Sequence, residues 1–202
     1  MITIPHDTLK ALLQAAAKKD IRFYLVGILI DRRATDCTLV ATNGHMMLAA
    51  PHTPPEGETL ALPVGQYIIP RELVETVKAD PAGMVTITID VAARTVSIAG
   101  ASTVPGALID GTFPDWRRVV PTSASNVPAQ FDPTYLAAFH KAALLLGAPK
   151  HGAIPFVTFH NGNGPATITF PCHDARGVLM PMRYTADGSL PAFEDVPAWA
   201  RQ

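Results

Sequence analysis

The stretch Gly111-Thr112-Phe113-Pro114-Asp115-Trp116-Arg117-Arg118-Val119-Val120-Pro121 decides how the rest of the chain is interpreted. It combines two aromatic side chains, two adjacent arginines and two prolines, and it follows a long region of strand-like sequence. Pro114 has no N–H to give to a sheet, so the stretch is not an ordinary strand. The prolines near both ends also exclude a regular helix. We therefore expect a fixed, extended connection whose side chains have a specific task.

The composition indicates a globular protein. The chain has 202 residues, enough for one or two domains with a real core. Hydrophobic residues make up 48% and charged residues 16%, which argues against disorder. The formal net charge is −1, so a nucleic-acid role needs a local basic face. No signal peptide and no apolar run of ~18 residues is present, so we expect a cytoplasmic protein with reduced thiols and no membrane contact.

The sequence indicates neither a metal centre nor an enzyme. Cys37 and Cys172 match no zinc-site spacing, and the seven histidines are scattered. There is no P-loop, no Gly-x-Ser-x-Gly and no His/Glu metal helix. Asp110 and Asp115 are interpreted as turn residues. We expect no cofactor, no metal and no catalytic residue.

Internal repeats carry most of the information about the fold. Three times a short apolar run meets a proline, at Pro5, Pro70 and Pro133, and a leucine follows. Proline at the first helical position is pre-organised for a helix, and Asp132 is a good N-cap. Amphipathic stretches follow each proline and predict helices over 6–18, 71–79 and 134–146. The alternative is that these three proline–helix starts are accidental.

Strand-like sequence follows each predicted helix. The predicted strands are 23–31, 37–50, 85–89, 95–98, 156–160 and 166–170. The run Asn161-Gly162-Asn163-Gly164 is a strong hairpin signal between the last two. Each unit therefore consists of a strand, a helix and two or three further strands, which is an α+β class. One unit cannot bury its sheet and its helix alone, so the units must pair.

Five segments in the right order carry a resemblance to a known family. They are Asp20-Ile21-Arg22-Phe23-Tyr24-Leu25-Val26-Gly27, Val40-Ala41-Thr42-Asn43-Gly44-His45, Ile69-Pro70-Arg71, residues 110–121, and Val178-Leu179-Met180-Pro181-Met182-Arg183. With these segments the chain resembles the bacterial DNA polymerase III β subunit family, the sliding clamps. The first 121 residues resemble the family's middle domain, and 131–183 resemble the second half of its last domain. The resemblance implies the DNA-clamp fold.

The chain also departs from the family pattern. A family chain has three domains of two units each, six units in all, whereas three units are found here. The resemblance implies a complete domain of two units over 1–121, a linker over 122–130 and a half domain of one unit over 131–183. Residues 184–202 extend beyond the family's usual end, and we expect them to form a flexible tail.

The resemblance implies a peptide-binding pocket between the complete domain and the half domain. In the family this pocket takes a short peptide, Gln-rich at its start and with Leu/Phe at its end, from DNA polymerases, the clamp loader and repair proteins. Methionines would offer an adaptable apolar floor, and arginines would take an acidic or amide end. The alternative is that the methionines are ordinary core and the arginines ordinary surface. The positions that correspond to the pocket are Leu25, Thr42, Gly44, His45, Met47, Pro114, Arg118, Val119, Val178, Met180, Pro181, Met182 and Arg183.

The resemblance also implies contact with double-stranded DNA, because the family lines a central hole with its helices. We expect contacts to phosphates, without sequence preference and strongly dependent on salt. Glu72, Glu75 and Asp80 reduce the positive charge of the second helix, so a solvated helix face is the alternative. The candidate residues are Lys10, Lys18, Lys19, Arg22, Tyr24, Arg71, Lys78 and Lys141.

The unpaired third unit leaves the assembly and the function open. It is expected to pair with its own copy in a homodimer or higher oligomer, or to pack back on the first domain. One function is a sliding-clamp-like processivity factor that encircles DNA as an oligomer. The other is a truncated clamp relative, from a phage or mobile element, that sequesters clamp-binding partners or the host clamp without encircling DNA. The tail segment Ser189-Leu190-Pro191-Ala192-Phe193 faintly resembles the family's peptide, so a tail that occupies a pocket is a further hypothesis beside a disordered terminus.

Overall fold

The computed structural model describes residues 1–54, 60–123, 129–150, 156–158 and 164–182. The helices in this part of the chain are α1 (His6–Leu13), α2 (Arg71–Thr76) and α3 (Pro133–Leu145), with 3-10 turns η1 (Phe23–Leu25) and η2 (Trp116–Val119). The strands are β1 (Ile2–Pro5), β2 (Gly27–Arg32), β3 (Cys37–Thr42), β4 (Met46–Pro51), β5 (Gly65–Pro70), β6 (Met84–Asp90), β7 (Thr95–Ala99), β8 (Thr103–Ala107), β9 (Phe156–Thr158), β10 (Ala166–Phe170) and β11 (His173–Leu179).

The strands form two antiparallel sheets, and the units exchange strands. One sheet has the order β1-β6-β7-β8, so the first strand of unit one pairs with unit two. The other has the order β5-β2-β3-β4-β11-β10-β9, so the first strand of unit two pairs with unit one. In the second sheet β11 of the third unit lies beside β4. The predicted α+β class is therefore confirmed, and units one and two exchange strands in both sheets.

The helices begin where the sequence predicts, but only one of the three prolines occupies the first helical position. Pro133 is at the start of α3, and the Asp132 carboxylate accepts a hydrogen bond from the Thr134 N–H at 2.8 Å, as expected of an N-cap. Pro5 and Pro70 instead have extended backbone and precede their helices, because each also ends a strand that the neighbouring unit pairs with. Helices α1 and α2 are shorter than predicted.

Some predicted strands need correction. Residues 23–25 form η1 rather than the start of a strand. The strands β8 and β11 were not predicted. Pro105 and Gly106 are unfavourable in a strand and interrupt the pattern of β8, and β11 begins with two polar residues, His173 and Asp174. The Asn161–Gly164 hairpin signal lies mostly in 159–163, outside the described residues.

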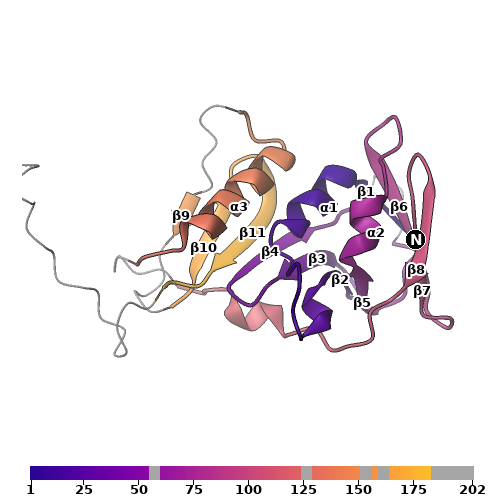
Figure 1. Cartoon of the computed structure of the whole chain (residues 1–202), viewed down its shortest axis with the longest axis horizontal. Coiled ribbons are helices and arrows are strands. Elements are labelled where there is room, and N and C mark those ends of the chain that lie inside the picture. Colours follow the sequence, from indigo (N-terminus) through magenta and orange to yellow (C-terminus); the bar gives the residue numbers. More distant parts are fainter. Residues whose placement is uncertain (55–59, 124–128, 151–155, 159–163, 183–202) are drawn as a thin grey trace, which may run out of the picture.

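In the seven-stranded sheet, β2, β3 and β4 are buried on both faces. Alternate strand residues such as Ile28 and Leu39 join the core beneath the helices, whereas Leu29 and Val40 join a second cluster on the other face. Phe113 is buried in this second cluster, so the stretch 111–121 covers the face opposite the helices. On the helical side, α3, α1 and α2 lie in a row (Figure 1).

Candidate functional site

A cavity of about 250 Å³ opens where the first domain meets the third unit. Its walls come from η1, the turn between β3 and β4, the stretch 111–121 and the end of β11. Most of the lining is apolar, including three methionines. The lining residues are Arg22, Leu25, Thr42, Gly44, His45, Met46, Met47, Pro114, Asp115, Trp116, Val119, Val178 and Met180.

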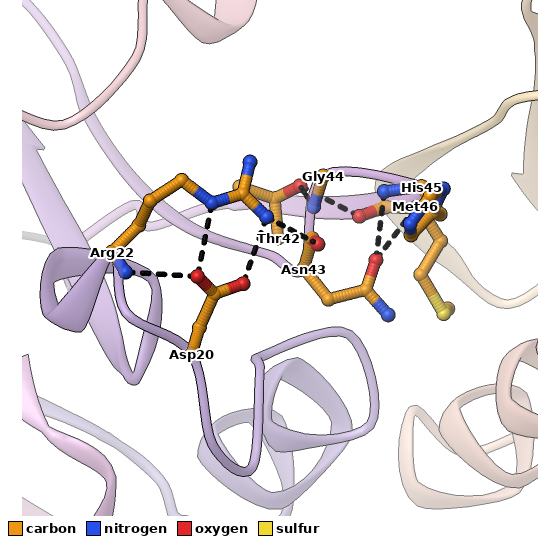
Figure 2. Close-up of polar contacts among 7 residues, drawn as sticks. All are labelled: Asp20, Arg22, Thr42, Asn43, Gly44, His45 and Met46. Atoms are coloured by element: carbon orange, nitrogen blue, oxygen red, sulfur yellow. Dashed lines mark hydrogen bonds and ion pairs between the residues drawn. The ribbon is translucent and has the colours of Figure 1, made fainter.

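The turn between β3 and β4 is fixed by its own side chains (Figure 2). The Asn43 side-chain oxygen accepts hydrogen bonds from the N–H groups of His45 and Met46, both at 2.9 Å. The Thr42 hydroxyl donates to the Met46 carbonyl at 2.7 Å and accepts from the Gly44 N–H at 3.1 Å. Gly44 has a φ of 90°, a left-handed conformation that suits glycine. One edge of the cavity is therefore rigid before any ligand arrives.

An ion pair holds Arg22 against this turn (Figure 2). Its guanidinium donates from Nε and from a terminal nitrogen to the two oxygens of Asp20, at 3.0 and 2.8 Å. The same terminal nitrogen reaches the Asn43 carbonyl at 3.5 Å. The hydrogen bonds from Arg22 lower the pKa of Asp20 to about 2. Arg22 therefore lies at the rim of a largely apolar cavity with its charge paired to Asp20.

A buried aspartate anchors the opposite wall. The stretch 111–121 carries Pro114, Trp116 and Val119 into the cavity, and Asp31 of β2 lies behind it. The Asp31 carboxylate accepts hydrogen bonds from the Trp116 indole Nε1 and from the Arg117 guanidinium. The Arg117 guanidinium also stacks 4.0 Å from the centre of the Trp116 ring, a cation–π contact.

The third unit completes the cavity. Strand β11 pairs with β4, which sets Val178 opposite Met47. The Met180 N–H then donates to the His45 carbonyl at 2.9 Å, so the pairing continues past the end of the strand. On the helical side the His45 ring stacks on Tyr135 of α3, with centroids 5.9 Å apart. Without the third unit the cavity would lack one wall.

The structure brings together most of the residues predicted for the pocket. Arg118, Pro181 and Met182 do not line the cavity, and Arg183 lies outside the described residues. The lining residues that the sequence did not indicate are Arg22, Met46, Asp115 and Trp116. Each of them lies next to a predicted pocket position or within a segment of the resemblance, and this proximity was the signal that could have found them. The predicted residues that do line it are Leu25, Thr42, Gly44, His45, Met47, Pro114, Val119, Val178 and Met180.

The residues predicted to contact DNA fall into separate groups. Lys18, Lys19 and Arg22 line a cleft between the end of α1 and the start of α3. Lys10 and Lys78 line a groove between α1 and α2, where Lys10 forms an ion pair with Asp7 at 3.2 Å. The remaining three are Arg71, Tyr24 and the exposed Lys141 of α3.

Two of these residues have other contacts in the fold. The Arg71 guanidinium donates to the carbonyls of Leu13 and Ala16 at 3.1 and 3.2 Å, and to Glu75 at 2.7 Å. It therefore satisfies the free carbonyls where α1 ends. Tyr24 packs with the cluster that contains Phe113, on the sheet face opposite the helices.

Two classes of site find no support within the described part of the chain. It contains no group of three or more His, Cys, Asp or Glu side chains placed to hold a metal ion. No helix of these residues has the length and apolar character needed to cross a bilayer.

The geometry can now be compared with known proteins. No protein-family model matches the chain. The Escherichia coli K12 beta sliding clamp is 28% identical over 162 residues, which cover 77% of this chain and 43% of the relative. The chain is similar to the bacterial beta sliding clamps. The Proteus mirabilis clamp is 26% identical over 92% of this chain and 51% of the relative. The Pseudomonas putida clamp is 32% identical over 68% of this chain and 37% of the relative. The chain thus spans about half or less of these clamps.

Solved clamp structures confirm the fold. The DNA polymerase sliding clamp of Pseudomonas aeruginosa matches with a TM-score of 0.65 at 19% identity, over 90% of this chain and 65% of that chain. The DNA polymerase III beta chain of Streptococcus pneumoniae matches with a TM-score of 0.68 at 16% identity, over 90% of this chain and 64% of that chain. The DNA-clamp fold expected from the sequence is therefore present, in shortened form.

Proposed function

We propose that the chain is a shortened sliding-clamp-type platform that binds short apolar peptides of replication or repair proteins in the cavity. The observation that carries this proposal is that one largely apolar cavity is lined both by the first domain and by the third unit, although the chain covers only 43% of the Escherichia coli relative. Its methionines adapt to different side chains, while the Asn43 turn and the Asp31 anchor hold the edges in place. A volume near the lower limit of ligand sites, roughly 300 Å³, suits one or two apolar side chains of a peptide.

Polar groups at the rim, including the paired Arg22, support a peptide with a polar part. Arg22 lies at one edge, and Met180 and Val119 are 39% and 43% exposed, so a ligand would cover them. Covering exposed apolar surface while leaving the charge at the rim is typical of peptide sites. The chemistry fits the Gln-rich start and Leu/Phe end expected from the sequence.

Fluorescence polarisation with a labelled peptide of that pattern tests the proposal. Met180→Glu should weaken binding at least about tenfold, because it places a charge in the apolar cavity. Val64→Glu is the matched control, since Val64 is 65% exposed and lies outside the cavity. Absence of saturable binding, or equal affinity for the two variants, would refute the peptide site.

A second function, contact with double-stranded DNA, is favoured by the row of helices. Lys18, Lys19 and Arg22 share one cleft beside α3, and Lys141 is exposed on α3 itself. Phosphate contacts of this kind weaken steeply with salt. Lys18→Gln with Lys19→Gln should lower affinity for duplex DNA and reduce its salt dependence, whereas Lys150→Gln serves as a control outside the cleft.

Retention on DNA separates a clamp from a competitor. A chain that encircles DNA stays on closed circles and is lost when they are linearised. A chain that only sequesters clamp-binding partners binds the peptide and is retained on neither. This comparison decides between the two functions left open by the sequence.

A further inference from the structure

The apolar cavity and the cleft between α1 and α3 share part of their walls. Arg22, His45 and Met46 line both hollows. The turn between β3 and β4 therefore lies between two sites, and Figure 2 shows the Asp20–Arg22 pair beside that turn. A chain that leaves the cavity past Arg22 and His45 enters the cleft directly, because the same side chains bound both.

The cleft has the lining of a groove for an extended chain. It has a volume of about 630 Å³ and runs between the end of α1 and the start of α3. A concave, partly apolar hollow with a few polar groups is typical of ligand sites, whereas a rigid duplex would touch only its rim. The apolar and aromatic residues of its lining are Ala16, Ala17, Met46, Ala138 and Tyr135, whose ring stacks on His45.

The uncompensated charge in the cleft is positive. Lys18 and Lys19 line it and are exposed, and neither forms an ion pair within the described part of the chain. The carboxylates at this end of the molecule already have partners. Asp20 is held in its ion pair, and Asp132 accepts hydrogen bonds from the N–H and the hydroxyl of Thr134 at 2.8 and 2.7 Å. Two ammonium groups thus remain without a counter-charge beside the apolar cavity.

We propose that the cleft receives an acidic segment of the same partner peptide whose apolar end occupies the cavity. This inference rests on the proposed peptide site and extends it. The polar start of the peptide would lie at the rim near Arg22, the wall that the cleft shares, so the acidic residues are those that precede that start. Their carboxylates would pair with Lys18 and Lys19.

The acidic segment selects among partners and does not replace the apolar anchor. Ion pairs of exposed lysines are individually weak and are screened by salt. Among partners with the same apolar end, those with acidic residues ahead of it should therefore bind more tightly. Duplex DNA is attracted by the same two lysines, so DNA in the cleft and the acidic segment would exclude each other.

Fluorescence polarisation with three labelled peptides tests the acidic segment. The first is the short peptide with the Gln-rich start and Leu/Phe end, the second adds two glutamates ahead of it, and the third adds two glutamines. At low salt the Glu-extended peptide should bind roughly fivefold more tightly than the Gln-extended one, and the difference should shrink as ionic strength rises. Failure of the short peptide to bind would refute the proposed peptide site itself, which is a different outcome from an extension without effect.

Variants of the two lysines locate the effect. Lys18→Gln with Lys19→Gln should remove the difference between the Glu-extended and Gln-extended peptides, with binding of the short peptide as the check that the fold is kept. Lys150→Gln is the matched control and should keep the difference, because Lys150 is an exposed lysine outside the cleft.

Charge reversal provides a second measurement. Lys18→Glu with Lys19→Glu should reverse the order, so that a Lys-extended peptide binds more tightly than the Glu-extended one. Equal affinity of the unmodified chain for the Glu-extended and Gln-extended peptides would overturn the proposal, as would a difference that survives in Lys18→Gln with Lys19→Gln. Loss of duplex DNA affinity in that double variant, without any effect on the extended peptides, would assign the cleft to DNA instead.

Discussion

The indole Nε1 of Trp116 donates a hydrogen bond to the buried carboxylate of Asp31 at 3.0 Å. These residues lie 85 positions apart in the sequence, and the contact ties the stretch 111–121 to β2, the strand next to the edge strand β5 of the seven-stranded sheet. The Arg117 guanidinium donates to the same carboxylate. Trp116 and Val119 line the cavity, so Asp31 positions a wall that it does not itself form.

Asp31→Asn should destabilise the fold by about 1–3 kcal/mol, because the half-buried Arg117 loses its charge-assisted hydrogen bond to a buried carboxylate. It should also weaken peptide binding by loosening the wall. Urea unfolding and fluorescence polarisation measure the two effects. Asp36→Asn, at an exposed aspartate close by, is the control and should change neither. Loss of stability without loss of peptide affinity would contradict the positioning role.

The same aspartate predicts a pH dependence. Burial raises the pKa of Asp31, and the hydrogen bonds from Arg117 and Trp116 more than offset this, so the pKa lies below its usual value. A depressed pKa contributes stability that is present above the ordinary value, ~3.9, and is lost as pH falls through the folded value. As pH is lowered below 4, the free energy of unfolding should therefore fall more steeply for the unmodified chain than for Asp31→Asn.

Gly44→Ala should disturb the cavity rim through Arg22. The left-handed backbone alone costs roughly 1–2 kcal/mol, and an added Cβ would lie 3.1 Å from a guanidinium nitrogen of Arg22. Gly83→Ala is the matched control, because Gly83 also has a positive φ, of 79°, but has nothing within 4 Å of an added Cβ. Both variants should lose similar stability, and only Gly44→Ala should bind peptide more weakly.

Arg71→Met should lower stability by about 1–3 kcal/mol, since it removes hydrogen bonds to two carbonyls at the end of α1. Lys78→Met should have little effect on stability, because Lys78 is exposed. Thermal unfolding compares the two. The effects on DNA affinity should be the opposite, so that Lys78→Met binds DNA more weakly than Arg71→Met. A destabilising Lys78→Met would show that the assignment of the two roles is wrong.

The carboxyl group of Asp20 should titrate near pH 2 in an NMR titration, because hydrogen bonds from Arg22 lower its pKa to about 2. The Asp20–Arg22 interaction is then fully present above pH ~4 and is lost as pH falls through the folded pKa. Arg22→Gln should raise the midpoint toward the ordinary ~3.9, although the backbone N–H of residue 22 still donates to Asp20 at 2.8 Å. An unchanged midpoint in this variant would mean that Arg22 is not the cause.

Features written in local sequence could be predicted, whereas those made by distant contacts could not. The starts of the helices at Pro5, Pro70 and Pro133 depend on a few neighbouring residues, and the structure has a helix at each. Most pocket residues were predicted because short motifs of the resemblance carry them. The pairing of β11 with β4 could not be predicted, because no local signal says which strand a third unit will join.

The partners of two charged residues could not be predicted from local sequence. Asp31 was predicted only as the end of the strand 23–31, and its partners come from residues 116 and 117. Arg71 looked like a free cation for DNA, but its partners come from α1. The sequence shows that a residue is charged but not which distant residue it pairs with. The burial and pairing of such groups therefore need the three-dimensional structure.

The two sheets end in edges of different character. The outer strand β8 carries Pro105 in its middle, opposite Ser97, and proline has no N–H to offer a strand laid alongside. Strand β9 ends the other sheet with Phe156-Val157-Thr158 and no proline. Addition of a further strand is therefore opposed at β8, whereas each residue of β9 has an N–H that it can give to an added strand.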